Sequence, residues 1–256
     1  MSNYRFITAC NTKKTYYEFI RPWINHHIKL FPNSDIKCIL VSEEIPEELK
    51  DLSNHLILFK PIENISTAYQ SQLVRLVYPV LLDDALNIIC DIDLFAMSKE
   101  ILTIFNHIPN KEKSFINYGK LSMRECEIGK EFAMCYSILS NQVIEEKLEV
   151  KTLEDIILFL KNNYANKDNE YGYEWFGDQK ILYNIFREYE WLVKLERPNN
   201  DRLDRDSYDY KNLLVKNIIE TNCIADLHAA RPYSEHKERI DTTLSYCDYP
   251  EEIKII

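Results

Sequence analysis

The stretch that decides the fold is residues 87–93, NIICDID, in which an apolar run ends in two aspartates separated by one residue. Because side chains alternate along an extended chain, residues two apart point the same way, so both carboxylates can leave the end of a strand together. Open α/β sheets bind their ligands beyond the carboxyl ends of their strands. The stretch therefore predicts a buried strand that presents Asp91 and Asp93 to a ligand.

The segments before this stretch alternate between apolar runs and runs with helical spacing of apolar residues. Such an alternation of strands and helices, with strands that are apolar almost throughout, is typical of a mainly parallel sheet covered by helices on both faces. The sequence thus predicts a Rossmann-like α/β fold. Strands are expected at 4–10, 36–41, 56–59 and 85–90, and helices at 15–30 and 66–82.

The alternation loosens after Asp93. A polar stretch rich in Asp and Arg, 197–210, is expected to be irregular. Because neither an internal repeat nor a low-complexity linker is present, we expect a single domain covering 1–256. Further helices are expected near 98–105, 153–162 and 178–189, and strands near 114–118 and 133–139.

Composition narrows the possible partners. The net charge is -10, which disfavours a nucleic-acid surface, and no apolar window approaches the ~18 residues of a membrane span. The seven cysteines are odd in number and lack CxxC spacing, so we expect reduced, buried thiols in a cytoplasmic protein. Only four glycines occur, and none has the spacing of a phosphate-binding glycine loop.

Electrostatics limits what can bind beside Asp91 and Asp93. A phosphate group near two carboxylates is repelled by ~4 kcal/mol per pair of unit charges at ~4 Å in a partly buried site. A hard divalent cation with oxygen ligands turns this repulsion into a bridge, so Mn²⁺ or Mg²⁺ is expected with a phosphate-bearing ligand. The alternative is that the two carboxylates only cap the next helix. A second Asp-x-Asp, residues 204–206, lacks a preceding apolar strand.

Five blocks along the chain carry a resemblance to a known family. The run 72–82, QLVRLVYPVLL, followed by 87–95, resembles the R-L-x-x-P-x-L-L and Asp-x-Asp-Leu block of GT-A glycosyltransferases, including glycogenin-like enzymes and sugar transferases of large DNA viruses. Similar matches are 6–8 with Tyr16, the run 175–179 (WFGDQ) and the run 226–233 (DLHAARPY). The blocks follow the family's order, which is more specific than any one of them.

This resemblance implies a GT-A fold with a nucleotide-sugar-binding half, 1–97, and an acceptor-side half, 98–256. It implies transfer of a sugar from a nucleotide-sugar donor, with a UDP-sugar favoured, to a hydroxyl of a glycan or another acceptor. The metal ligands implied are Asp91, Asp93 and His228. The donor contacts implied are Thr8, Ala9, Tyr16, Ile92 and the two aspartates for the nucleotide, and Arg231 for the diphosphate. Arg75 would either lie against the diphosphate or brace the two aspartates.

The catalytic carboxylates are implied less directly. The Asp-Gln pair at Asp178 is where these families place a carboxylate near the sugar or acceptor, so Asp178 is the first candidate base if the reaction inverts, and Asp204 is the second. Trp175 and Tyr173 adjoin it and are candidates for stacking on a sugar. The sequence departs from the glycogenin-like pattern after His228, since it lacks the glycine and Lys-Pro-Trp that usually follow.

Structural roles remain open for most of these residues. Arg75 could be an ordinary surface arginine, His228 a histidine at a strand end, and Asp178 a helix N-cap, while the aromatic residues could belong to the core. Three other functions also fit part of the pattern. They are a Mg²⁺-dependent phosphohydrolase of the haloacid-dehalogenase type, a nucleotidyltransferase, and a catalytically degenerate sugar-nucleotide-binding protein.

Overall fold

The structure is a computed structural model that describes residues 4–119, 131–165, 173–195, 202–205, 208–212, 215–216, 219, 224–247 and 249. The chain folds as two compact units, each assembled from separate segments. The first unit comprises Met1–Lys13, Asp35–Asp91 and Pro109–Pro198, and the second comprises Lys14–Ser34, Ile92–Ile108 and Asn199–Ile256. The expected single domain with a division at residue 97 stays a prediction.

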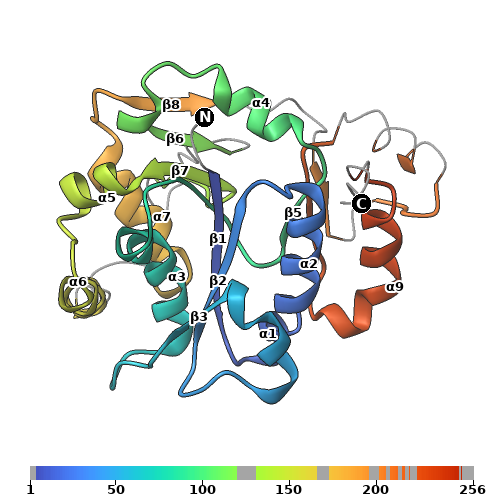
Figure 1. Ribbon diagram of the computed structural model, residues 1–256, viewed down its shortest axis with the longest axis horizontal. Helices are drawn as coiled ribbons and strands as arrows, with labels where there is room; N and C mark the ends of the chain where they lie inside the picture. The colour runs from blue at the N-terminus through green and yellow to red at the C-terminus, as the bar shows by residue number, and fades with distance from the viewer. Residues whose placement is uncertain are drawn as a thin grey trace, which may run out of the picture. The chain divides into compact units, whose positions relative to one another are not determined.

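The first unit is built on a seven-stranded sheet with the spatial order β3-β2-β1-β4-β7-β6-β8 (Figure 1). The pairs β1–β2, β1–β4, β2–β3 and β6–β8 are parallel, whereas β7 runs antiparallel to β4 and β6. The expected mainly parallel sheet is therefore confirmed. Its strands are β1 (Tyr4–Asn11), β2 (Asp35–Val41), β3 (Leu56–Phe59), β4 (Leu86–Ile89), β6 (Phe115–Tyr118), β7 (Tyr136–Ser140) and β8 (Leu192–Leu195).

Helices flank this sheet, and Figure 1 shows α3, α5, α6 and α7 together on one side of it. The helix α3 packs on β1 and β2 and contacts α6 and α7. Ser66 caps α3 by accepting a hydrogen bond from Tyr69 N at 3.2 Å. The helices of this unit are α3 (Thr67–Val77), α5 (Asn141–Leu148), α6 (Leu153–Ala165) and α7 (Tyr173–Phe186), with 3₁₀ turns at Glu47–His55, Tyr78–Leu81 and Lys111–Lys113.

An apolar core joins α3 to the middle of the sheet. Ile7 of β1, Ile39 of β2 and Ile89 of β4 are fully buried, as are Leu73 and Leu76 of α3. Each such side chain stabilises the fold by ~1.5–3 kcal/mol relative to an exposed one. The core therefore holds the carboxyl ends of β1 and β4 against one face of α3. Candidate site residues come directly after these strand ends in the chain.

The second unit contains a three-stranded sheet with the order β5-β10-β9. The central strand β10 pairs antiparallel with β5 and parallel with β9. His228 consequently lies opposite Leu94 on one side and opposite Asp204 on the other. The strands are β5 (Leu94–Ala96), β9 (Arg202–Asp204) and β10 (Asp226–His228).

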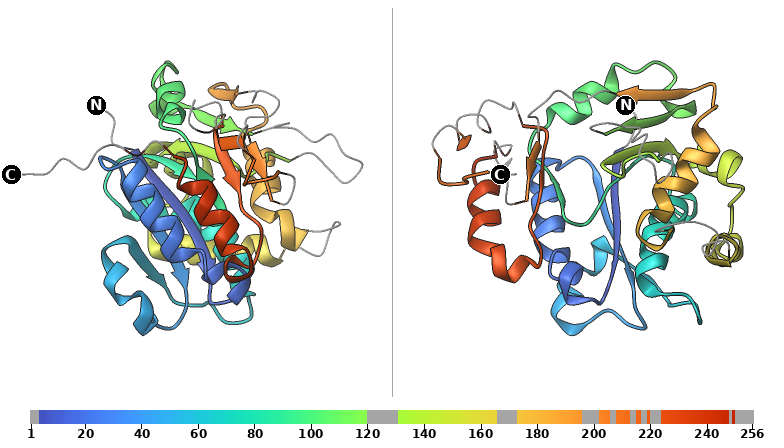
Figure 2. Two further views of the ribbon diagram at one scale, coloured as in Figure 1. Left: turned by 90° about the vertical axis from the view of Figure 1, so that its right-hand side faces the viewer. Right: turned by 180° about the vertical axis from the view of Figure 1, so that it is seen from behind.

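Two long helices of the second unit, α2 and α9, lie side by side in both views of Figure 2. The indole of Trp23 in α2 donates a hydrogen bond to Leu94 O at 3.0 Å, which fastens α2 to β5. The ring of Phe19 contacts the ring of Tyr233 at the start of α9, with centroids 5.7 Å apart. The helices are α1 (Lys14–Tyr17), α2 (Ile20–Leu30), α4 (Glu100–Asn106) and α9 (Tyr233–Leu244).

The structure corrects several expected boundaries. The helix expected at 15–30 is two helices, because Phe19 N bonds Tyr16 O in a tight turn. The helix expected at 66–82 ends at Val77, since Pro79 has no N–H with which to continue it. The helix expected at 178–189 corresponds to the part of α7 after a kink at Phe176, since α7 itself runs from Tyr173 to Phe186. β9 lies in the stretch expected to be irregular. The expected elements did not include α5, α9, β5, β8, β10 or the 3₁₀ turns Glu47–His55 and Lys111–Lys113.

Two expectations from composition can be compared with the described residues. Across those residues, we find no helix whose length and apolar character would suit a membrane span. The cysteines among them, Cys10, Cys38, Cys90, Cys135 and Cys247, are buried thiols, as expected. Cys126 and Cys223 lie outside the described residues.

A buried histidine links α2 to β5. His26 Nε2 lies 2.5 Å from Ala96 O, which can only accept, so this nitrogen carries the proton. His26 Nδ1 lies 2.8 Å from the Tyr249 hydroxyl. Burial lowers the pKa of His26 from 6.5 to about 4, the bond to Ala96 O opposes this, and the charge of Lys29 adds to the lowering. His26 is therefore neutral in the folded protein at any pH above about 4.

We expect this histidine to make the protein sensitive to acid. Between pH 6.5 and about 4 the unfolded chain binds a proton that folded His26 does not, so stability falls as the pH falls through this window. The expected loss is about 3 kcal/mol, given 1.36 kcal/mol per pKa unit. Urea unfolding at a series of pH values measures it. His26→Gln should reduce the slope without removing it, because burial also lowers the pKa of His27. His107→Gln, at an exposed position, should leave the slope unchanged, and equal slopes for wild type and His26→Gln would contradict the prediction.

Candidate active site

One cluster of charges lies in the first unit, where β4 ends. Arg75 of α3 is buried, and its Nη1 donates to Cys90 O at 2.9 Å and to Asp91 Oδ1 at 2.7 Å. Its Nη2 donates to Asp178 Oδ2 at 2.6 Å. One guanidinium thus joins the end of the central strand to α7. Arg75 therefore contacts the first aspartate of the motif, and its implied role toward a donor diphosphate stays a prediction.

Burial and charge oppose each other in this cluster. Burial alone would lower the pKa of Arg75, but the charges and hydrogen bonds of Asp91 and Asp178 raise it above its ordinary value. Burial raises the pKa of Asp178, and the Arg75 charge counteracts part of that rise. The side chain of Asp178 is 2% exposed and that of Asp91 is 42% exposed. Arg75 and Asp178 therefore form a buried pair, and Asp91 is the member that faces solvent.

The structure excludes one of the alternative roles, since Arg75 is 4% exposed and is not a surface arginine. The capping role of Asp178 stays open. α7 has a kink at Phe176, where φ is −117°, and Asp178 lies at the start of the helical segment that follows the kink. Asp178 Oδ1 accepts a hydrogen bond from the next residue, Gln179 N, at 2.8 Å. Whether Asp178 serves as a base stays a prediction.

The two aspartates of the motif do not cap a helix, because β5 follows them directly and α4 begins only at Glu100, after Lys99 at its N-cap position. The helix expected near 98–105 is α4, but β5, which was not expected, separates it from the motif. Asp91 belongs to the first unit and Asp93 to the second.

The end of β1 holds the residues predicted to contact the nucleotide in the first unit. Thr8 lies opposite Cys38 of β2 with its side chain fully buried, and Ala9 is 6% exposed. Sequence reasoning missed Asn11, whose Nδ2 donates to Thr67 Oγ1 at 2.9 Å and links β1 to α3. The only sequence signal for Asn11 was its place at the end of the first expected strand. Nucleotide contacts by Thr8 and Ala9 stay predictions.

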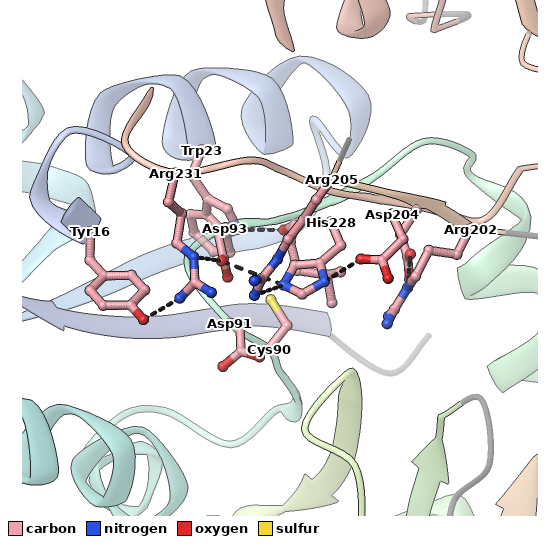
Figure 3. Close-up of polar contacts among 12 residues, drawn as sticks. Tyr16, Trp23, Cys90, Asp91, Asp93, Arg202, Asp204, Arg205, His228 and Arg231 are labelled. Atoms are coloured by element: carbon pink, nitrogen blue, oxygen red, sulfur yellow. Dashed lines mark hydrogen bonds and ion pairs between the residues drawn. The ribbon is translucent and has the colours of Figure 1, made fainter. Parts of the chain in front are cut away.

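A second cluster lies in the second unit and runs from Tyr16 to Asp204 (Figure 3). Arg231 stacks over the ring of Tyr16, with its guanidinium carbon 5.0 Å from the ring centroid, and also donates to the Tyr16 hydroxyl. Arg231 Nε lies 3.3 Å from Asp93 Oδ2. His228 Nε2 lies 3.5 Å from the same oxygen. The structure therefore brings together four residues that the sequence resemblance singled out far apart in the chain.

Asp93 is the buried centre of this cluster. Its backbone O accepts from Ala229 N at 2.8 Å, which fixes the end of the motif beside β10. Burial alone would raise the pKa of Asp93, but His228, Arg231 and Arg205 lower it below its ordinary value. Among the described residues, Asp93 Oδ2 makes no hydrogen bond, although it is buried. A buried, charged oxygen without a hydrogen bond is the kind of atom that binds a cation.

His228 has a partner at each ring nitrogen. Its Nδ1 lies 2.7 Å from Asp204 Oδ1, and its Nε2 lies 3.2 Å from Arg205 Nη2. Arg205 N also donates to His228 O at 2.7 Å, and Arg205 has a φ of 42°, in the left-handed region that favours glycine. Unusual backbone conformations of this kind often accompany functional sites.

Sequence reasoning missed the pair that holds β9 on β10. Arg202 Nε donates to Asp226 Oδ1 at 2.7 Å, and its Nη2 lies 3.3 Å from Oδ2 of the same fully buried carboxylate. Arg202 and Asp226 are opposite each other in the register, as are Asp204 and His228. The only signal in the sequence was a shared spacing: Arg202 lies two residues before Asp204, and Asp226 lies two residues before His228.

Some expected site features lie outside what can be described. The side chains of Tyr173 and Trp175 and the residue Asp206 are not among the described residues. Within those residues, no three His, Cys, Asp or Glu side chains are arranged as a complete set of metal ligands. Ile92 is buried in the second unit. A metal bound by Asp91, Asp93 and His228 therefore stays a prediction.

The fold matches solved glycosyltransferases. It aligns with glycosyltransferase GlyE of Streptococcus pneumoniae over 100% of this chain and 67% of that one, at 16% identity and a TM-score of 0.53. It aligns with an active-site mutant of LgtC over 97% and 98% of the two chains, at 13% identity and a TM-score of 0.54. It also aligns with the bifunctional glycosyltransferase WbbM over 99% of this chain and 51% of that one, at 12% identity and a TM-score of 0.50.

No protein-family model and no curated protein matches the sequence. The similarity therefore rests on structure, and sequence identities this low show a shared fold alone. The specific resemblance to glycogenin-like and viral enzymes stays a prediction. The mixed α/β sheet and its flanking helices have the GT-A glycosyltransferase fold.

Proposed function

We propose that this protein is a metal-dependent glycosyltransferase that transfers a sugar from a nucleoside-diphosphate sugar, with a UDP-sugar favoured, to a hydroxyl group of an acceptor. The observation that carries the proposal is the buried Asp93 Oδ2, which makes no hydrogen bond among the described residues and lies 3.5 Å from His228 Nε2. This pair lies within a GT-A fold. The galactosyltransferase LgtC, whose fold this chain shares, was solved with donor and acceptor sugar analogues.

The residues present suit a divalent cation. Asp93 offers a carboxylate oxygen and His228 a ring nitrogen, a combination that Mn²⁺ accepts and that Mg²⁺ accepts less readily. We propose that Asp93 and His228 hold the ion, with Asp91, two residues earlier in the chain, as the third protein ligand. A bound divalent cation would neutralise the negative charge that builds up on the departing diphosphate.

The arginines of the second unit suit the donor diphosphate. Arg231 and Arg205 both lie near Asp93, and a guanidinium presents a planar set of donors to phosphate oxygens. The Tyr16 ring, which lies beside Arg231, is proposed to contact the nucleoside. Electrostatic stabilisation of a leaving group is usually the largest contribution that a protein makes to such a reaction.

In the proposed reaction, the bond from the anomeric carbon to the diphosphate oxygen breaks and a bond to the acceptor oxygen forms. If the reaction inverts, a carboxylate takes the proton of the acceptor hydroxyl, and Asp178 remains our first candidate. Its burial raises its pKa, which favours proton acceptance, although its pairing with Arg75 acts in the opposite direction. Asp204 is the second candidate.

The rival functions have less support. A haloacid-dehalogenase-type phosphohydrolase carries its motif on the first strand, whereas here the motif follows β4. A nucleotidyltransferase normally needs a glycine-rich loop after the first strand, and this sequence has no glycine before Gly119. A degenerate protein that binds a sugar nucleotide without transfer is a possible outcome of the following experiment.

A panel of nucleotide sugars tests the proposal. We expect at least one UDP-sugar to release nucleoside diphosphate in the presence of the protein and Mn²⁺, and the release to stop when EDTA is added. Binding of a donor without release would favour the degenerate protein. Release of inorganic phosphate from simple phosphomonoesters would favour the hydrolase. Absence of both binding and release across the panel would contradict the proposal.

A further inference from the structure

The ring of His228 is held at both nitrogens by groups of opposite hydrogen-bonding character. Asp204 Oδ1, 2.7 Å from Nδ1, belongs to a carboxylate, which only accepts when ionised. Arg205 Nη2, 3.2 Å from Nε2, belongs to a guanidinium, which only donates. The two contacts agree on one neutral form of the ring. In that form Nδ1 carries the proton and Nε2 carries the lone pair.

His228 Nε2 lies 3.5 Å from Asp93 Oδ2, a buried oxygen that makes no hydrogen bond among the described residues and lies 3.3 Å from Arg231 Nε. Two electron-rich atoms at this separation repel each other unless positive charge lies near them, which Arg205 and Arg231 supply here and a bound cation would supply more closely. The opposite tautomer would place a proton on Nε2 and remove one of the two electron pairs. The tautomer of His228 thus decides whether this pair of atoms can bind a cation.

We propose that Asp204 is a positioning residue that fixes His228 in the Nδ1-protonated form, so that Nε2 is available as a metal ligand. The inference rests on the proposed function, because it concerns the same metal site. It assigns to Asp204 a role that differs from that of a catalytic base. Carboxylates that accept a proton from the far nitrogen of a metal-binding histidine orient the ring in this way, and their loss typically lowers metal affinity 10–100-fold.

The strand β9 places Asp204 beside the ring of His228. Asp204 lies opposite His228 in the parallel register of β9 and β10, and the buried pair of Arg202 with Asp226 fixes that register two residues earlier. The bond from Arg205 N to His228 O, at 2.7 Å, fixes it on the other side. The Asp204 side chain is 58% exposed, so it remains in contact with water.

The tautomer can be measured without any metal. Two-bond ¹H–¹⁵N spectra of the metal-free protein at about pH 8, above the ordinary histidine pKa of ~6.5, distinguish the two forms of each ring. The His228 signal is assigned by its loss in His228→Gln. We expect Nδ1–H in wild type. A ring that carries its proton on Nε2, or on both nitrogens, overturns the inference.

Two substitutions of Asp204 separate its geometry from its charge. Asp204→Ala removes the acceptor, so we expect the Nε2–H form to appear and Mn²⁺ affinity, measured by titration calorimetry, to fall 10–100-fold. Asp204→Asn keeps an oxygen acceptor without the charge, so we expect it to keep the wild-type tautomer and bind Mn²⁺ more tightly than Asp204→Ala. Equal losses in both variants with an unchanged tautomer would show a role of charge alone and overturn the inference.

Asp209→Asn is the matched control for the Asp204 variants. Asp209→Asn makes the same charge change nearby in the chain, at an exposed residue that accepts from Lys211 N at 3.1 Å, and it should leave the tautomer and Mn²⁺ affinity unchanged. Failure of the proposed function appears as wild-type protein that turns over no donor. Failure of this inference appears in the ring spectra and in the ranking of the Asp204 variants, whatever the donor result.

Discussion

Asp93→Asn is expected to lower the Mn²⁺-dependent release of nucleoside diphosphate by about 10²–10³-fold, the usual effect of removing one electrostatic stabiliser from an active site. The substitution keeps the size of the side chain but replaces one carboxylate oxygen by an amide that donates. Asp93 is buried, and His228, Arg231 and Arg205 lower its pKa, so its charged form is built into the fold. Loss of that charge should weaken Mn²⁺ binding and turnover together.

The control for this prediction is Asp241→Asn in the same unit. Asp241 pairs with Lys237 at a partly exposed position of α9, and its loss should leave release unchanged. Circular dichroism of both variants checks that they fold. If Asp93→Asn retains wild-type release and wild-type Mn²⁺ affinity while folded, the metal site at Asp93 is wrong, even if the protein transfers sugar.

The sequence predicted the parts of the fold that depend on local periodicity. Continuous apolar runs marked β1, β2, β3 and β4, and helical spacing marked α3, because each of these elements buries a regular set of its own side chains. The same reasoning predicted that both carboxylates at 91 and 93 leave the strand end together, but only Asp91 is exposed, whereas Asp93 is buried. The burial of Arg75 could not be read locally, because Asp178 lies 103 residues away.

The elements that build the second cluster were not predictable from periodicity. β5, β9 and β10 are each three residues long, which is too short to show an alternation of polar and apolar residues. They exist because segments far apart in sequence pair with each other: Leu94 lies opposite His228, which lies opposite Asp204. The resemblance singled out His228 as a ligand, but only the register shows that Asp204 contacts its ring.

The roles of individual residues are harder to predict than their positions. Asp178 and Asp204 were both expected as candidate bases because each is a carboxylate in a suggestive sequence context. The structure surrounds them with different partners: a buried arginine for Asp178 and an imidazole for Asp204. Environments that differ in this way give chemically identical groups different functions. No local feature of the sequence distinguishes the two.

Arg75→Met is expected to destabilise the protein by about 3–5 kcal/mol, the usual effect of removing one partner of a buried ion pair. Methionine fills much of the space of arginine, so little of the loss comes from packing. The Asp178 carboxylate, 2% exposed, would be left without its partner at 2.6 Å. Asp91, at 42% exposed, would be hydrated and contribute less to the loss. Urea unfolding at pH 7 measures the change in the free energy of unfolding.

The pH dependence of this variant distinguishes an unpaired charge from a packing defect. Burial already raises the pKa of Asp178, and removing Arg75 takes away the interaction that lowers it. Folded Asp178 would then hold a proton that the unfolded chain releases, so stability decreases as the pH rises above the ordinary aspartate pKa of ~3.9. We therefore expect the loss in Arg75→Met, relative to wild type, to be larger at pH 8 than at pH 5.

A second substitution, added to Arg75→Met, tests whether the unpaired Asp178 charge causes the loss of stability. Arg75→Met combined with Asp178→Asn removes the unpaired charge, so it should recover part of the lost stability even though it departs further from wild type. Arg187→Met is the control, because the Arg187 side chain is 51% exposed and contacts Glu188 at 3.8 Å and the Tyr183 ring at 5.8 Å, so its loss should cost little. If the double variant is less stable than Arg75→Met at pH 8, burial of an unpaired Asp178 charge is not the cause.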